Sequence, residues 1–175
     1  GKPAPEDYRN DREFWYNLNA NFDLMFACWR LYLWTGDSTY IKSPAFERFF
    51  EISVTGYIDK WILHEDSLLT RPKLPNAPVP FNDKDNFHRS RGLASYSEDV
   101  PDLKIGVDLV AAIYRALLSY ASVLELNGNI TKAAFYEKKA ERYRQKIEQD
   151  WWDGTAALYQ TYYTTNGTFG KGGSG

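Results

Sequence analysis

Apolar residues recur at helical spacing in two segments of the first third of the chain. We predict a helix from about Glu13 to Thr35, because large apolar side chains repeat every three or four residues and also cover its other faces. Gly36 follows as a C-terminal cap. A second helix is predicted from Ser43-Pro44 to Trp61, with one apolar stripe and charges elsewhere. A helix that is apolar on every face must be covered on every side, whereas a helix with a charged stripe lies at a boundary with water. This pair is therefore predicted to be an inner helix followed by an outer helix.

The second half of the chain repeats this order. A helix predicted from Gly106 to Leu126 is apolar on nearly every face, and Gly128 stops it. The next helix, from Ile130 to Trp151, has one apolar stripe and a charged remainder. The order inner, outer, inner, outer is typical of concentric layers of helices. We therefore predict an all-α fold of antiparallel helical hairpins, with about four long helices in one domain spanning residues 1–175.

The connections between the helices indicate where function lies. Both inner helices pass into outer helices through short turns, so these turns share one end of the bundle, here called the closed end. The lead-in segment 1–12, the long irregular segment 64–104 and the chain after Asp153 then share the opposite, open end. Residues 157–163 alternate as a strand does, and Asn166-Gly167 predicts the turn of a short β-hairpin. Long irregular loops on a rigid scaffold usually carry function, so we expect the site at the open end.

Composition narrows the classes of partner. The formal net charge of −2 gives no electrostatic reason to expect nucleic acid or an anionic membrane. We find no apolar run long enough to span a bilayer and no signal-peptide pattern at Gly1, although this does not place the protein in the cytoplasm. The single cysteine, Cys28, excludes an internal disulfide and reads as a buried thiol. Aromatic residues make up 17% of the chain, and those not needed for packing are suited to stack on sugar rings.

Three segments resemble a known family. These are residues 14–23, the turn 35–41, and the run from Ala133 that closes in Trp151-Trp152-Asp153. They resemble the six-hairpin glycosidase superfamily, the (α/α)6-barrel fold of many bacterial carbohydrate-active enzymes. The similarity in helix pattern covers most of the chain. Because that fold is a closed ring with more helices than are predicted here, the chain looks like part of such a barrel.

The resemblance implies a glycoside hydrolase, with carboxylates on loops above the inner helices. Such enzymes need one acid to protonate the leaving oxygen and a second carboxylate as base or nucleophile. By position in the fold, Glu98 and Asp99 are the expected catalytic residues. Adjacent side chains usually diverge, so one of the two is expected to do other work. The alternative is that Asp99 or Asp102 only favours the positive N-terminus of the third helix.

Further residues near the open end are candidates for substrate binding. Asn17 and Asn21 lie one helical turn apart in an otherwise apolar helix, and they either line a sugar-binding funnel or satisfy the backbone of the lead-in segment. The whole predicted binding set is Trp15, Tyr16, Asn17, Asn21, Tyr96, Asp102 and Trp152. Core packing is the alternative for each aromatic residue taken singly.

No cofactor and no metal is expected. His64 and His88 do not have metal-ligand spacing. Arg71, Arg89, Arg91 and Lys104 suit either an acidic sugar or a solvated loop. The expected partner is an oligo- or polysaccharide, which would place the protein in the periplasm or outside the cell. We also expect the chain alone to be inactive and to self-associate, because inner-helix faces that further hairpins would cover are left open.

The competing hypothesis is a helical-repeat interaction module without catalysis. The stretch from Tyr120 through Gly128 to Ala140 resembles a tetratricopeptide repeat. Repeat arrays need three or more similar units of fixed period, whereas the two units here are separated by the segment 64–104.

Overall fold

The computed structural model of the chain describes residues 16–72, 92–97, 100 and 102–171. The long helices of this part are α2 (Asn19–Thr35), α4 (Pro44–Val54), α6 (Val107–Leu126) and α7 (Ile130–Lys146). Shorter helical pieces are α3 (Thr39–Lys42), α5 (Gly56–Trp61) and the π-helical turn η1 (Ile147–Trp151) that extends α7. The described part is mostly helical with a small set of antiparallel strands near its C-terminal side, which confirms the predicted fold class.

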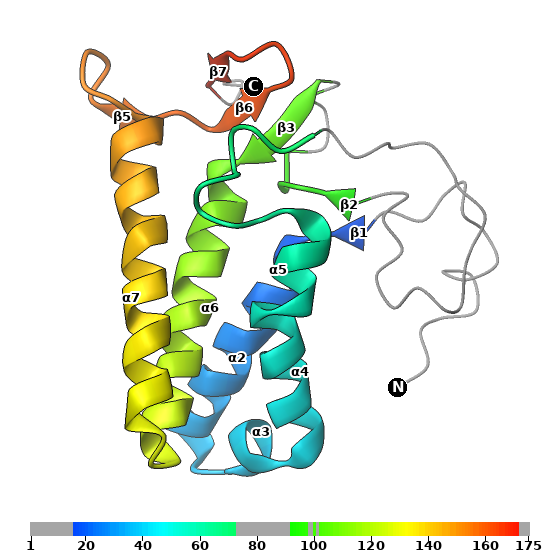
Figure 1. The fold of residues 1–175 in the computed structure, drawn as a ribbon, viewed down its shortest axis with the longest axis vertical. Helices are drawn as coiled ribbons and strands as arrows, with labels where there is room; N and C mark the ends of the chain where they lie inside the picture. Colours follow the sequence, from blue (N-terminus) through cyan, green and yellow to red (C-terminus); the bar gives the residue numbers. More distant parts are fainter. Residues whose placement is uncertain (1–15, 73–91, 98–99, 101, 172–175) are drawn as a thin grey trace, which may run out of the picture.

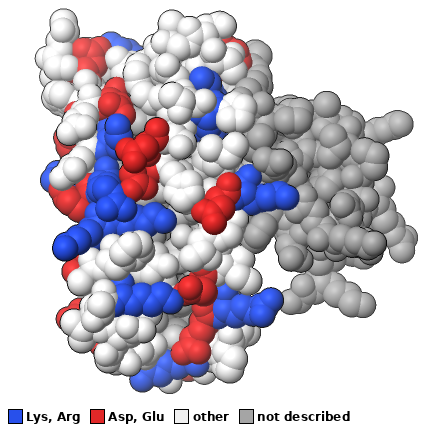
Figure 2. Space-filling view, viewed as in Figure 1, with Lys and Arg blue, Asp and Glu red and all other residues white. Residues whose placement is uncertain are grey.

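Two inner helices are flanked by two outer ones. In Figure 1, α2 and α6 lie next to each other, α4 covers α2, and α7 covers α6. The core between them includes Phe22, Phe50, Tyr57, Ile113 and Tyr143, all fully buried. Figure 2 shows basic and acidic side chains gathered over α7, at the left of the view, as expected for an outer helix.

The two ends of the bundle are arranged as the connections predict. The α2–α3 turn and the α6–α7 turn lie together at the lower end of Figure 1, and the strands lie at the upper end. Gly36 and Gly128 both take positive φ angles in these closed-end turns. The open end of the described part therefore contains the start of α6, the end of α7 and the strands next to them.

The start of α2 corrects the sequence prediction. The helix begins at Asn19, because Tyr16–Asn17 form β1, which pairs in parallel with β2 (Gly92–Leu93). The Leu18 N–H donates to the Leu93 carbonyl over 2.9 Å. Pairing with a distant segment therefore overrides the helical pattern at this point, and residues 13–15 lie outside the described part.

The predicted helix from Ser43-Pro44 to Trp61 begins where expected but is interrupted. Thr55 has φ −118° and ψ −95°, so α4 stops before it and α5 starts after it. The Thr55 hydroxyl donates to the Glu51 carbonyl over 2.6 Å. Such a bond competes with the helical ladder.

Besides the parallel β1–β2 pair, the described strands form two small antiparallel sheets. β3 (Leu103–Gly106), β6 (Tyr162–Thr164) and β7 (Phe169–Gly170) make one antiparallel sheet in that order. β4 (Trp152–Asp153) pairs with β5 (Leu158–Tyr159) in the other. The single strand predicted over 157–163 is therefore divided between the two sheets. The predicted Asn166-Gly167 turn is present, with Gly167 at φ +78°.

One expectation about the inner helices is wrong, because by length and composition α6 would be able to cross a membrane, although most of it is buried. In addition, α2 is not covered on every side, as expected for a chain that leaves inner-helix faces open. Its exposed apolar residues are Leu24, Leu31, Leu33 and Trp34, and Trp34 is 77% exposed. Cys28 is buried as expected, and burial raises the pKa of its thiol.

Candidate functional site

Part of the predicted site falls outside the described residues. This applies to Glu98, Asp99 and Trp15, and of Tyr16 only the backbone is described. The segment immediately before the acidic pair, residues 94–97, is described and is called the entry loop below. The described groups nearest to the acidic pair in the sequence are therefore those that hold this loop.

Asp108, in the first turn of α6, anchors the entry loop. Its Oδ1 accepts the Ser95 hydroxyl over 2.8 Å, and its Oδ2 accepts the Tyr96 N–H over 2.7 Å. The buried Asn19 amide also donates to Oδ2 over 3.1 Å. One carboxylate thus joins α2, α6 and the loop. A carboxylate in the first turn is also favoured by the helix dipole, and Asp108 has this position in α6, whereas Asp99 lies outside the described residues.

The entry loop approaches β3 too closely for a side chain at Gly106. The Gly106 N–H donates to the Ala94 carbonyl over 2.8 Å. A Cβ at this position would lie 2.1 Å from Asp108 Oδ1 and 2.3 Å from the Ser95 hydroxyl oxygen. The glycine therefore allows the contact that Asp108 makes with the loop.

Asn17 supports the same loop from the side of β1. Its amide donates to the Ser95 carbonyl over 2.9 Å, and its Oδ1 accepts the Asn19 N–H over 3.0 Å. Asn17 therefore bonds the backbone of the entry loop and of the helix start. It does not share a helix face with Asn21, because it lies in β1 whereas the half-buried Asn21 lies in α2.

Tyr96 links the entry loop to a charged pair between the inner helices. Its hydroxyl donates to Asp23 Oδ2 over 2.5 Å, while Arg115 donates to Asp23 Oδ1. The Arg115 guanidinium also lies over the Phe26 ring, 4.1 Å from its centroid. The Tyr96 side chain remains exposed, and the hydrogen bond to Asp23, with a contribution from burial, raises the pKa of Tyr96 to about 12.

Asp102 and Trp152 are held by the strands instead. The Asp102 carboxylate accepts the Asn166 amide over 3.1 Å, and its carbonyl accepts the Thr165 N–H over 2.8 Å. Trp152 packs edge-on against Tyr159 in the β4–β5 hairpin and remains partly exposed. Their predicted roles in substrate binding stay predictions.

The described basic residues of the long segment have a structural environment that the sequence did not indicate. Arg71 is only 2% exposed and donates to the carbonyls of Trp61 and Lys104, each over 2.8 Å. Burial lowers the pKa of Arg71 to about 10. Neither an acidic-sugar site nor a solvated loop describes it, while Arg89 and Arg91 lie outside the described part. Within that part, no group of three His, Cys, Asp or Glu side chains is placed to hold a metal ion.

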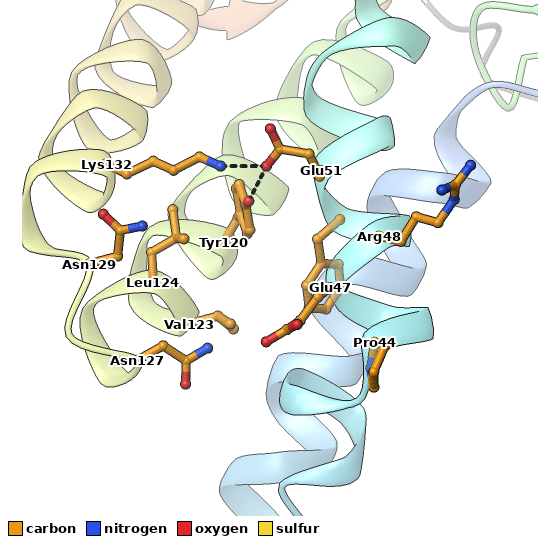
Figure 3. A pocket seen from close by; sticks show the side chains of 11 residues that line it. Pro44, Glu47, Arg48, Glu51, Tyr120, Val123, Leu124, Asn127, Asn129 and Lys132 are labelled. Atoms are coloured by element: carbon orange, nitrogen blue, oxygen red, sulfur yellow. Dashed lines mark hydrogen bonds and ion pairs between the residues drawn. The ribbon is translucent and has the colours of Figure 1, made fainter.

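A cavity of about 500 Å³ opens at the other end of the bundle, between α4 and the α6–α7 turn (Figure 3). Glu51 accepts the Tyr120 hydroxyl and the Lys132 ammonium there, each over 2.6 Å. Partial burial raises the pKa of Glu51, but these two bonds outweigh burial and leave the pKa lowered. The cavity contains none of the predicted site residues, and its central contacts tie α4 to α6 and α7.

Asp23, Arg115 and Asp108 are residues of the open end that the predicted site does not include. Asp23 is visible in the sequence as a charge in an apolar helix, and Asp108 lies close in the sequence to the acidic segment. Arg115 is not marked in this way, because isolated charges on a helix are usually solvated.

Comparison with known families supports the resemblance. A family model described as Trehalase matches residues 85–171, which include the entry loop, α6, α7 and the strands after them. This match confirms the similarity to the six-hairpin glycosidase superfamily over that segment. No curated protein and no solved structure matches the chain.

Proposed function

We propose that this chain is part of a glycoside hydrolase and that its carbohydrate site lies at the open end. The observation that carries the proposal is the trehalase match over residues 85–171, because it includes both the acidic segment and the second pair of layered helices. The proposal is also supported by the anchored entry loop, which leads directly into Glu98 and Asp99.

The chemistry proposed for the acidic segment is carboxylate acid/base catalysis. One of Glu98 and Asp99 donates a proton to the glycosidic oxygen, and a second carboxylate acts as base or nucleophile. A loop held by two hydrogen bonds to Asp108 is suited to this task, because an acid must be kept within hydrogen-bond reach of the departing oxygen. Exposed aromatic rings such as Tyr96 would then bind the sugar by stacking.

Trehalose is the first ligand to test, together with other glucosides and a panel of oligosaccharides. Binding is measured by isothermal titration calorimetry and hydrolysis by release of reducing sugar. We expect sugar binding by the wild-type chain. Because this chain alone is expected to be inactive, hydrolysis is measured on a longer protein that supplies further hairpins, in which we expect Glu98→Gln or Asp99→Asn to lower the rate by about 100-fold or more. Asp150→Asn, on η1 at the end of α7, is the matched control and is expected to leave the rate unchanged.

Two results would count against the proposal. Absence of binding to every sugar in the panel would remove the carbohydrate assignment. Hydrolysis at a rate that neither acidic substitution changes would contradict the catalytic role of Glu98 and Asp99.

A further inference from the structure

Asp23, Tyr96 and Arg115 meet at the open end from three segments that are distant in the sequence. Asp23 comes from α2, Tyr96 from the entry loop and Arg115 from α6. The charge pair lies between the two inner helices, and the tyrosine belongs to the loop that leads into the acidic segment. The cluster is therefore next to the proposed site without containing either of its proposed catalytic carboxylates.

The exposure of the cluster argues against a purely structural role. The side chains of Arg115 and Asp23 are 43% and 33% exposed, and ion pairs accessible to water contribute little to stability. Ala20 on α2 and Ala111 on α6, about one helical turn before Asp23 and Arg115, are exposed as well. The Tyr96 ring is 56% exposed although its hydroxyl is fixed.

The cluster is held in place before any ligand arrives. Arg115 is fixed by Asp23 and by the Phe26 ring, and its Nε is buried without a hydrogen-bond partner in the described part of the chain. A guanidinium has five N–H donors, so the two contacts named leave donors for another group. An aromatic ring with a fixed orientation also loses little conformational entropy when it binds.

The charges of the cluster favour a neutral polar ligand. Asp23 balances Arg115, so an anion would meet the carboxylate and a cation would meet the guanidinium. A sugar hydroxyl both donates and accepts hydrogen bonds, and a neighbouring carboxylate and guanidinium provide the two complementary partners. The exposed tyrosine ring supplies the apolar surface on which a sugar ring can stack.

We propose that Asp23, Tyr96 and Arg115 form a sugar-binding subsite, in which Tyr96 stacks on a pyranose ring and the charged pair hydrogen-bonds its hydroxyl groups. The inference rests on the proposed carbohydrate function and adds binding residues to it. Asp23 and Arg115 bind the ring in this assignment and take no part in proton transfer.

The subsite is tested by titrating trehalose and the same oligosaccharide panel into the wild-type chain and into Arg115→Met, Tyr96→Ala and Tyr96→Phe. We expect Arg115→Met and Tyr96→Ala each to weaken binding by about tenfold or more, and Tyr96→Phe to have a smaller effect because the ring remains. Arg144→Met is the matched control, since Arg144 forms an exposed ion pair with Glu141 on α7. Circular dichroism of each variant establishes that the fold is retained.

A second measurement on the wild-type chain does not depend on how the variants fold. The Nε–H resonance of Arg115, identified by its loss in Arg115→Met, is expected to shift when sugar is added. Sugar binding that leaves this resonance and the affinities of the folded variants unchanged would overturn the subsite while preserving the proposed function. No binding to any sugar would overturn the proposed function, and the subsite with it.

Discussion

At the scale of single residues, Tyr96 connects ionisation to folding. Its hydroxyl donates to Asp23, and this bond exists only while the phenol is protonated. The pKa of Tyr96 is raised from 10.0 to about 12, so the neutral form is favoured in the folded chain. The stabilisation from this bond is therefore complete below about pH 10 and is lost as the pH rises to about 12.

We predict that Tyr96→Phe lowers the free energy of unfolding by about 0.5–1.5 kcal/mol at neutral pH. The difference between the two proteins should shrink as the pH rises from about 10 towards about 12. Urea unfolding of both proteins at a series of pH values measures this difference. The ionisation of the other tyrosines does not affect it, because both proteins contain them. In an Asp23→Ala background, which removes the acceptor, Tyr96→Phe should have little effect. A difference that stays constant up to pH 12 would show that Asp23 does not control the phenol.

Gly106 gives a prediction about close packing at the start of α6. Gly106→Ala would bring a methyl group to 2.1 Å from Asp108 Oδ1, so the entry loop must move. We expect a loss of about 1–3 kcal/mol in the free energy of unfolding, measured with urea. Gly154→Ala is the control, because the nearest atom to its Cβ is 3.7 Å away. Equal stability of the two variants would contradict the packing described at Gly106.

At the scale of secondary-structure elements, Arg71 joins α5 to β3. It donates to the carbonyl of Trp61, the last residue of α5, and to the Lys104 carbonyl in β3. Arg71→Ala removes both bonds and leaves buried carbonyls without this donor, so we predict a loss of about 2–4 kcal/mol in urea unfolding. Arg48→Ala, on the exposed face of α4, should cost less than about 0.5 kcal/mol. A small effect at Arg71 would show that other contacts hold this segment.

The sequence predicts elements well where local periodicity determines them. The predicted starts of the last two helices differ from α6 and α7 by at most one residue, because an unbroken apolar stripe is visible without any partner. The start of α2 could not be predicted in the same way, since β1 depends on β2, a segment 76 residues away. β3 is a similar case, because it exists only through pairing with β6.

The candidate site shows the same limit. Tyr96 and Asn17 stood out because a polar or aromatic residue near the open end is visible in the sequence alone. The roles of Asp108 and Arg115 could not be predicted, because they depend on what each side chain contacts: Asp108 holds the entry loop, and Arg115 meets Asp23 across two helices. Such three-way contacts depend on tertiary packing, which one sequence does not specify residue by residue.

At the scale of the whole molecule, the exposed apolar side of the inner helices predicts self-association. Leu24, Leu31 and Trp34 on α2, and Leu118 on α6, are all more than one-third exposed. Exposed apolar residues on neighbouring helices favour contact with another apolar surface, here a second copy of the chain. We expect light scattering to show oligomers at high concentration, and an apolar dye to become fluorescent on dilution as this surface is freed.

The double substitution Leu31→Glu/Leu118→Glu should give a monomer with weak dye binding, because it places two charges on that surface. Phe135→Glu is the control, since Phe135 is 55% exposed on the outer helix α7 and is not part of it. If the wild-type chain is a monomer that does not bind dye, the apolar surface does not drive association and the four helices are stable by themselves. The interpretation of the chain as part of a larger ring would then lose its main physical support, because the exposed inner faces would need no further hairpins.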